Sequence, residues 1–124
     1  TKISLKIDGK EIPQDDIFMV SVCNCRYNGD GMMQAPSALP DDGIFNITVM
    51  KKISPFKSII SLPKMKDGTF ISMKEAALFT GKTVEVNSSP PVYVEADGEL
   101  IGETPAHFRI IPNALNVVIK QKPV

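Results

Sequence analysis

The sequence carries no net charge, because fourteen lysine and arginine residues balance fourteen aspartate and glutamate residues in a chain of 124. Proteins that bind polyanions usually carry an excess of positive charge, which attracts the phosphates of the partner. We therefore expect no nucleic-acid partner. The sequence also lacks an apolar run near the roughly 20 residues needed to cross a bilayer. It does not open with a charged and then apolar leader. These absences predict a domain that is soluble as written.

Histidine and cysteine are scarce, since the chain has one histidine, His107, and two cysteines, Cys23 and Cys25. The cysteines are two positions apart in a predicted strand, so both side chains face the same way without the geometry that favours a disulfide. We expect buried thiols in a reducing compartment, which favours a cytoplasmic location, either free or peripheral at the inner membrane surface. A Cys-x-Cys metal site would need two further ligands. His107 lies in an alternating stretch and is expected to be a strand residue.

No complete catalytic set is visible in the sequence. The Gly29-Asp30-Gly31 segment lacks the lysine, the hydroxyl residue and the following helix of a phosphate-binding loop. Asp41-Asp42-Gly43, preceded by Pro40, does offer hard oxygen ligands in a turn whose main-chain carbonyls can also point inward. Such a loop suits Mg²⁺ or Ca²⁺. An ordinary turn that leads into a strand explains the same residues equally well.

Short alternating apolar segments and repeated turns dominate the rest of the chain. Five of the eight glycines directly follow an aspartate, and Asp-Gly pairs supply the positive φ angles of tight turns. The expected fold class is mainly β, an antiparallel β-sandwich or distorted barrel with one or two short helices. Residues 17–25 are apolar or small on both alternating faces, which predicts a central strand covered on both sides. The other predicted strands are residues 3–7, 44–50, 70–71, 82–87, 92–96, 108–111 and 115–120, and residues 73–79 fit either a helical turn or a strand.

One segment, residues 51–66, departs from the β pattern. Ser54-Pro55 is typical of a helix N-cap followed by proline in the first turn, and Pro63 is expected to limit the helix to about two turns. The segment holds five lysines and no acidic residue, and its apolar residues are Ile53, Phe56, Ile59, Ile60, Leu62 and Met65. These apolar side chains either rest on the sheet while the lysines stay in water, or form a basic apolar edge that touches an anionic membrane surface.

A hairpin is predicted over residues 92–105, and it is the central candidate for a functional element in this chain. Apolar and polar residues alternate from Val92 to Asp97, and Asp97-Gly98 then supplies the tight turn. Glu99 begins the returning strand, so two carboxylates flank one sharp turn at an exposed rim. From this local pattern alone, an ordinary solvated hairpin tip explains the residues.

Several short motifs follow one another in the order and at the spacing of a known domain. They are Asn24, Gly29-Asp30-Gly31-Met32, Ala35-Pro36-Ser37-Ala38-Leu39-Pro40-Asp41-Asp42-Gly43-Ile44-Phe45, Asp97-Gly98-Glu99, Gly102-Glu103-Thr104-Pro105 and Ile111-Pro112-Asn113-Ala114-Leu115. Together they resemble the C-terminal β-domain of the diacylglycerol kinase-like lipid kinases, the superfamily that also holds sphingosine and ceramide kinases. The resemblance implies that residues 1–124 form a single β-sandwich domain, the C-terminal half of a two-domain enzyme. The N-terminal α/β half, which binds ATP through a Gly-Gly-Asp-Gly motif, is not contained in this sequence.

The resemblance also implies roles for particular residues. Glu99 corresponds to the general base that takes the proton of a lipid hydroxyl as that oxygen attacks the γ-phosphate of ATP, and Asp97 would support it. A structural Mg²⁺ would be held by the Asp42 carboxylate and the main-chain oxygens of Leu39 and Ile44, apart from the Mg²⁺ that accompanies ATP. Asp30 departs from the family pattern, in which glycine is frequent.

The expected function is therefore that of the lipid-binding and base-supplying C-terminal domain of an ATP-dependent lipid kinase, inactive by itself. Its expected partners are the N-terminal α/β domain of the same chain, which binds most of the ATP, and the lipid substrate. Peripheral contact with a membrane is a further open expectation. The alternative is a stand-alone β-sandwich binding or interaction module without catalysis, in which the acidic turns are only turns.

Overall fold

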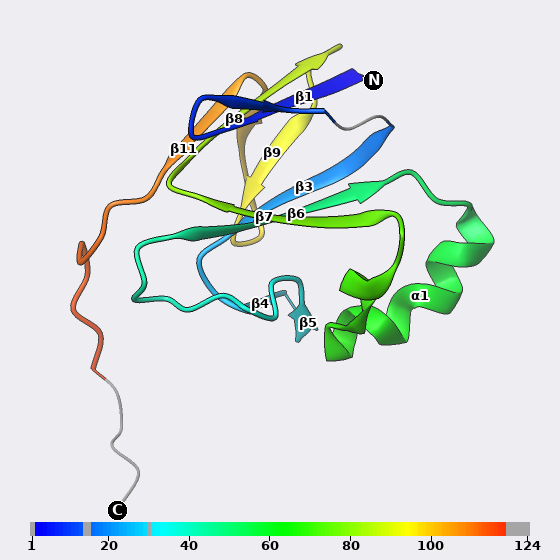
Figure 1. The fold of residues 1–124 in the computed structure, drawn as a ribbon, viewed down its shortest axis with the longest axis horizontal. Coiled ribbons are helices and arrows are strands. Elements are labelled where there is room, and N and C mark those ends of the chain that lie inside the picture. Colours follow the sequence, from blue (N-terminus) through cyan, green and yellow to red (C-terminus); the bar gives the residue numbers. More distant parts are fainter. Residues whose placement is uncertain (1, 14–15, 30, 119–124) are drawn as a thin grey trace, which may run out of the picture.

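The computed structural model describes residues 2–13, 16–29 and 31–118, which form two main antiparallel sheets (Figure 1). The first sheet contains, in spatial order, β11 (Ala106–Arg109), β8 (Thr83–Ser89), β1 (Lys2–Ile7) and β2 (Lys10–Ile12). The second contains β3 (Ile17–Cys23), β6 (Phe45–Lys51) and β7 (Ala76–Gly81). Two ribbons complete the strands: β9 (Tyr93–Ala96) with β10 (Glu99–Glu103), and β4 (Tyr27–Asn28) with β5 (Met32–Met33).

The two main sheets pack face to face through one apolar core. Its buried members are Leu5, Ile7, Ile17, Ile47, Val49, Val84 and Val86. They come from alternate positions of four strands, as expected when one face of each strand turns inward and the other outward. The β-sandwich prediction is therefore confirmed, and the sheets of the described residues do not close into a distorted barrel.

Strand β6 lies in the middle of its sheet and is buried on both faces. Ile47 and Val49 face the sandwich core, whereas Met50 joins a second core with Phe70 and Met73. Thr48 donates a hydrogen bond of 2.7 Å from its hydroxyl to the main-chain carbonyl of Gln34, which holds the segment after β5 against the outer face. A helix and this segment thus form a third layer below the sandwich (Figure 1).

The prediction that residues 17–25 form a central strand is wrong. Strand β3 ends at Cys23 and lies at the edge of its sheet, because β6 pairs with β7 on its other side. At this edge the Phe18 side chain is 71% exposed. The expectation of two buried thiols also fails in part: Cys25 is exposed beyond the strand, and Cys23 is half-buried. Burial raises the pKa of the Cys23 thiol, which is typical of a structural cysteine.

Helix α1 (Pro55–Asp67) is longer than predicted. It begins as expected, with the Ser54 hydroxyl accepting a hydrogen bond from the main-chain N–H of Lys57 at 3.3 Å. Pro63 lies inside the helix and does not end it; the helix stops at Gly68, which has a φ of 76°. The turn after Pro63 is stabilised by packing, since Met65 contacts the second core. Tertiary contact here outweighs the hydrogen bond that a proline removes.

The apolar side chains in the segment 51–66 do not pack on the sheet as a group. Ile53 and Met65 pack against the second core, so they follow the simpler of the two interpretations. Four others are exposed: Phe56, Ile59, Ile60 and Leu62. Among the described residues, no helix is both long enough and apolar enough to cross a bilayer.

The segments that follow α1 settle two further predictions. Residues 70–71 belong to a short 3₁₀ helix, η1 (Thr69–Ser72), so the predicted strand there is wrong. Phe70 is fully buried in the second core. Apolar residues occur at this place in the sequence because they are buried there, although they do not form a strand. Of the two possibilities for residues 73–79, the strand is right, because β7 begins at Ala76.

The sheets are joined where β7 leaves one and β8 enters the other, with only Lys82 between them. The Asp8 carboxylate accepts hydrogen bonds of 2.9 Å from the main-chain N–H groups of Lys82 and Thr83. These bonds hold the pKa of the Asp8 carboxyl below its ordinary value. Gly81 permits the close approach, because a Cβ at this residue would collide with the side chain of Ile7. The β1–β2 turn is therefore fixed to the sheet crossover.

The predicted strand over residues 115–120 is not observed in its described part. Residues 115–118 adopt no regular structure, and residues 119–120 lie outside the described residues. Leu115 and Val117 are 84% and 76% exposed, so their alternation does not mark a buried face. Strand β11 ends at Arg109, whereas the strand predicted over residues 108–111 would have ended two residues later.

Candidate functional site

The hairpin of β9 and β10 matches the sequence prediction closely. Asp97 and Gly98 have φ angles of 50° and 89°, the positive values that a tight two-residue hairpin turn requires. Glu99 pairs with Ala96 at the start of the returning strand, and the Asp97 and Glu99 side chains are both exposed. Among the described residues, neither carboxylate takes part in a hydrogen bond or an ion pair. Two unneutralised acids therefore flank the tip.

The base of the hairpin is fixed firmly although its tip is exposed. Thr104, which is 6% exposed, donates a main-chain hydrogen bond of 2.9 Å to the carbonyl of Val92. Its hydroxyl accepts a bond of 3.0 Å from the Val92 N–H and also lies in close hydrogen-bonding contact with the hydroxyl of Ser88, the residue before the last of β8. The hairpin is thus anchored to the end of β8, and the carboxylates are held on a fixed arm.

Exposed apolar side chains lie on the same hairpin as the two carboxylates. Tyr93, Leu100 and Ile101 are 74%, 65% and 61% exposed. Strand β10 has a register shift between Leu100 and Gly102, a bulge that redirects the side chains on either side of it. A shallow pocket of about 220 Å³ lies beside this bulge, with Ile101 and Phe108 in its wall. Sequence reasoning missed this pocket, because it depends on how the hairpin lies against β11.

His107 lies in β11, as the sequence predicted, and it also lines this pocket. It pairs with Glu85 of β8 across the sheet, while the neighbouring Phe108 packs against the sandwich core. Alternation along the strand therefore explains its position without a catalytic role.

The Asp41-Asp42-Gly43 loop lies between β5 and β6 and is exposed. The Asp42 carboxylate accepts a hydrogen bond of 2.9 Å from the main-chain N–H of Ile44, which closes the turn on itself. This bond uses one oxygen, Oδ1, and leaves the other free of protein donors among the described residues. The main-chain oxygens of Leu39 and Ile44 accept no hydrogen bond among the described loop residues. This set of hard oxygen donors fits a cation such as Mg²⁺.

Within the described part of the chain, no three His, Cys, Asp or Glu side chains gather in the manner of a metal site. A cation at Asp42 would therefore depend on one carboxylate, on main-chain oxygens and on water. Asp30, the other acid near this region of the sequence, lies outside the described residues. The ligand set of Asp42, Leu39 and Ile44 remains a prediction.

Two motifs that lie far apart in the sequence come together at this loop. Gly43 has a φ of 69°, and a Cβ at this position would lie 3.4 Å from the Cγ atom of Pro112. The turn after β11 therefore packs on the Asp-Asp-Gly loop. Among the described residues, no hydrogen bond or ion pair links this loop to the hairpin that carries Glu99.

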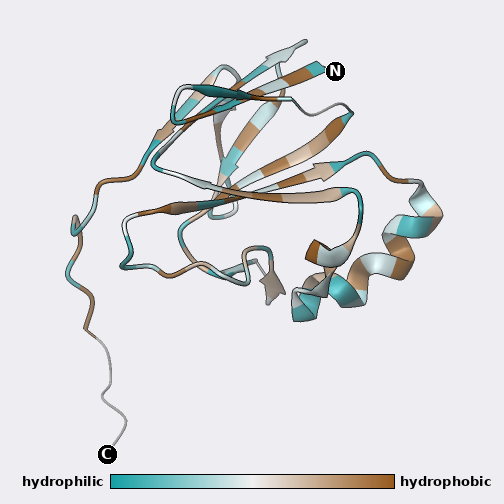
Figure 2. Ribbon diagram, viewed as in Figure 1, coloured by the Kyte–Doolittle hydropathy of each residue, from teal (hydrophilic) through white to brown (hydrophobic). Residues whose placement is uncertain are grey.

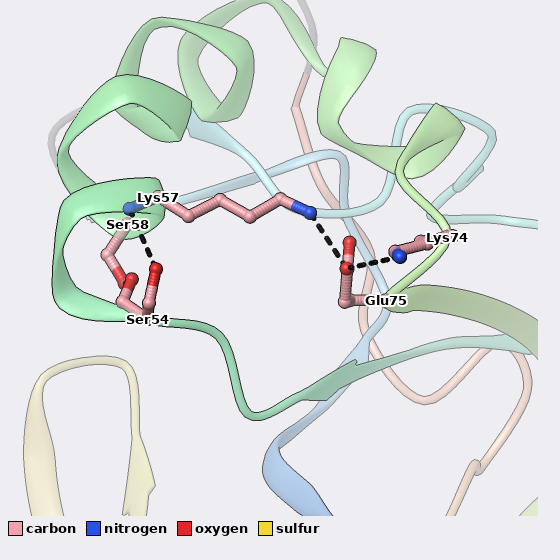
Figure 3. Close-up of polar contacts among 5 residues, drawn as sticks. All are labelled: Ser54, Lys57, Ser58, Lys74 and Glu75. Carbon is pink, nitrogen blue, oxygen red and sulfur yellow. Dashed lines mark hydrogen bonds and ion pairs between the residues drawn. The ribbon is translucent and has the colours of Figure 1, made fainter.

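A further acidic residue, Glu75, was not singled out from the sequence. Its side chain is only 15% exposed, and Oε1 lies 2.7 Å from the Lys57 ammonium nitrogen and 4.0 Å from that of Lys74 (Figure 3). The hydrogen bond from Lys57 lowers the pKa of the Glu75 carboxyl. Oε2 is buried and has no hydrogen-bond partner among the described residues. Since Lys57 lies in the first turns of α1 and Glu75 directly precedes β7, the pair fixes the helix to the sheet.

Comparison with known families identifies the fold. Residues 1–119 match the family described as the YegS C-terminal NAD kinase beta sandwich-like domain. The chain belongs to this family. Membership accounts for the sandwich, and the match covers both the Asp-Asp-Gly loop and the Asp-Gly-Glu hairpin. The resemblance seen in the sequence motifs is thereby confirmed at the level of the family.

Several curated relatives of this chain are named as lipid kinases. A diacylglycerol kinase of Mycobacterium tuberculosis is 31% identical over 114 residues, which cover 92% of this chain and 37% of the relative. A solved diacylglycerol kinase structure from Bacillus anthracis superposes with a TM-score of 0.66 at 19% identity, over 89% of this chain and 39% of that one. At this identity the structural match shows the fold alone. The chain spans little more than a third of the length of the curated relatives that it matches first.

Proposed function

We propose that this chain is the lipid-binding and base-supplying C-terminal domain of an ATP-dependent lipid kinase. The reaction would transfer the γ-phosphoryl group of ATP to the hydroxyl of a lipid. Family membership and the names of the relatives support the reaction class. The observation that carries the assignment of roles is the exposed Glu99, which has no partner among the described residues and lies at the tip of a hairpin whose base is fixed by Thr104.

In this proposal Glu99 accepts the proton of the lipid hydroxyl as its oxygen attacks phosphorus. Phosphoryl transfer asks the protein chiefly to position the reactants, and a carboxylate on a fixed arm suits the removal of one proton. Asp97, on the other side of the turn, would support Glu99 as a neighbouring acceptor that holds water beside the reacting hydroxyl. ATP and its Mg²⁺ would be bound mainly by an N-terminal α/β domain of the same protein.

The surroundings of Glu99 support a lipid as the acceptor. Tyr93, Leu100 and Ile101 expose apolar surface on the same hairpin as the proposed base. A lipid that reaches Glu99 with its hydroxyl could bury part of its apolar body against these side chains, at roughly 25 cal/mol per Å² of apolar area. We assign the Asp42 loop a supporting role, in which a bound Mg²⁺ would stabilise the loop and the Pro112 turn that packs on it.

The test is the replacement Glu99→Gln in the full-length protein, measured by ATP-dependent phosphorylation of a panel of lipids in detergent micelles. A missing general base lowers kcat by about 10²- to 10⁴-fold, and the melting temperature should stay unchanged because Glu99 is exposed and makes no described contact. Glu95→Gln is the matched control, since Glu95 is an exposed acid on the other strand of the same hairpin. Wild-type turnover by Glu99→Gln would refute the role of base.

A further inference from the structure

Helix α1 presents two opposite faces. Lys57, Ser61 and Met65, which are spaced four residues apart, form the inward face and are the helical residues that are at least half-buried. On the opposite side Phe56, Ile59 and Ile60 are 75%, 68% and 57% exposed. The apolar surface of this short helix therefore faces away from the protein, the reverse of the usual arrangement. Figure 2 shows hydrophobic residues on the outer turns of α1, at the periphery of the molecule.

The charges around this apolar face are positive. Residues 51–66 hold five lysines and no acid, and Lys64 and Lys66 lie in the last turn of the helix. Neither of these two lysines forms an ion pair within the described part of the chain. The nearest acids in the sequence are engaged: the Asp67 carboxylate accepts hydrogen bonds from Thr69, and Glu75 binds Lys57.

The helix is also held rigidly in place. The Ser54 cap fixes its start, the Lys57–Glu75 pair fixes its inner face, and Gly68 ends it against Met33 and Pro36. A preformed helix does not lose conformational entropy when a partner covers it, as a segment that folds on binding does.

We propose that the outer face of α1 docks on the surface of an anionic lipid bilayer. Phe56, Ile59 and Ile60 would enter the interface, while Lys64 and Lys66 would contact headgroup phosphates. Lysine is depleted from the centres of protein–protein interfaces but enriched beside the apolar face of helices that lie on membranes. The charge pattern therefore favours lipid over a protein as the partner of this face. This inference rests on the proposed function, because docking on a bilayer would bring a lipid kinase to its substrate.

Vesicle co-sedimentation of the full-length protein tests the proposal without ATP, so that its outcome is independent of turnover. Vesicles of equal parts phosphatidylglycerol and phosphatidylcholine should bind the protein, and pure phosphatidylcholine vesicles should bind it much more weakly. Phe56→Ser combined with Ile60→Ser should weaken binding by about tenfold or more, since the apolar contact is lost. Lys64→Glu combined with Lys66→Glu should remove the preference for anionic lipid.

The control variants change exposed residues elsewhere in the protein. Leu115→Ser removes an apolar side chain that is 84% exposed in the C-terminal segment, which lies on the side of the molecule opposite α1 (Figure 1). Lys2→Glu combined with Lys10→Glu reverses the same amount of charge on the β1–β2 hairpin. Both controls should bind as the wild type does. Absence of wild-type binding to anionic vesicles, or equal losses in the control and helix variants, would overturn the proposal.

A labelling experiment tests the competing possibility that another part of the full-length protein covers α1. Phe56→Cys is labelled with a polarity-sensitive dye in a background of Cys23→Ser and Cys25→Ser, because Cys25 is exposed and would react. Emission typical of water that shifts to shorter wavelength only with anionic vesicles supports membrane docking. Emission already typical of an apolar environment without vesicles shows a protein partner and refutes the proposal.

Discussion

Two Asp-Gly turns show how a residue acquires a role from its tertiary surroundings. Asp8 and Asp97 have nearly equal φ angles, 49° and 50°, and each precedes a glycine in a hairpin. The Asp8 carboxylate accepts three hydrogen bonds from Lys82 and Thr83, so its role is to stabilise the fold. Asp97 accepts none among the described residues and stays exposed beside Glu99. Only the second turn has acidic groups free to act on a ligand.

The hydrogen bonds of Asp8 predict a pH-dependent contribution to stability. Because the pKa of the folded Asp8 carboxyl lies below the ordinary value of 3.8, its contribution is complete above that pH and is lost as the pH falls through the lowered pKa. Asp8→Asn should therefore lower the free energy of unfolding at pH 7, and the difference from the wild type should shrink in acid. Urea unfolding from pH 7 to pH 3 measures this, with Asp97→Asn as the control that should have no such effect.

The Asp42 loop predicts a specific response to Mg²⁺. A cation that binds only the folded state at ten times its dissociation constant stabilises it by about 1.4 kcal/mol. Adding Mg²⁺ should therefore raise the melting temperature of the wild type, and Asp42→Asn should remove the rise because the carboxylate is the one charged ligand proposed. Asp41→Asn is the matched control, since Asp41 is its exposed neighbour. A loss of the response in Asp41→Asn, but not in Asp42→Asn, would contradict the assignment.

At the scale of elements, close packing at glycines decides where α1 ends. Gly68 has a φ of 76°, which favours glycine, and it lies against β5 and the segment after it. A Cβ at Gly68 would lie 2.7 Å from Met33 Sδ and 2.8 Å from Pro36 Cγ. The sequence predicted the N-cap of this helix from Ser54-Pro55, but its end depends on a neighbour more than thirty residues earlier in the chain. Pro63 was for that reason a misleading stop signal.

Gly68→Ala should destabilise the protein by more than Gly9→Ala does. The two glycines share nearly the same φ, 76° and 77°, so alanine brings similar backbone strain to both. At Gly9 the added Cβ meets nothing within 4 Å, whereas at Gly68 it collides with Met33 and Pro36. The free energy of unfolding of Gly68→Ala minus that of Gly9→Ala therefore measures the cost of the collision alone. Overpacking of this kind costs about 1–3 kcal/mol. Equal losses would show that the contacts at Gly68 relax freely.

Across the described residues, the sandwich core is closed, and two of the surfaces with exposed apolar side chains bear on the proposed function. One surface is the hairpin around Glu99, and the other is the outer face of α1. The chain spans little more than a third of the length of its first curated relatives. In the proposed function, these are the surfaces that further protein and lipid would cover.

We accordingly expect the 124-residue chain alone to transfer no phosphate, and the full-length protein to phosphorylate a lipid with ATP and Mg²⁺. Thin-layer separation of radiolabelled lipids, with diacylglycerol, sphingosine, ceramide and phosphatidylglycerol as acceptors, measures both. Lipid phosphorylation by the isolated chain would refute the proposal that a separate N-terminal domain binds ATP. A full-length protein without an ATP-binding α/β segment upstream of this chain would favour a stand-alone binding module instead.

Most local features of this protein follow from neighbouring residues in its sequence. Alternation and Asp-Gly turns predicted the β-sandwich class, the β9–β10 hairpin and the exposed Glu99, because strand period and turn geometry are set by neighbouring residues. The motifs of residues 24–45 and 97–115 were specific enough to indicate the family. Other features became clear from the three-dimensional packing: β6 is central and β3 peripheral, the helix continues past Pro63, and most apolar residues of α1 face outward. Those outcomes depend on which elements pack together over long distances in the chain, and local periodicity carries no information about that choice.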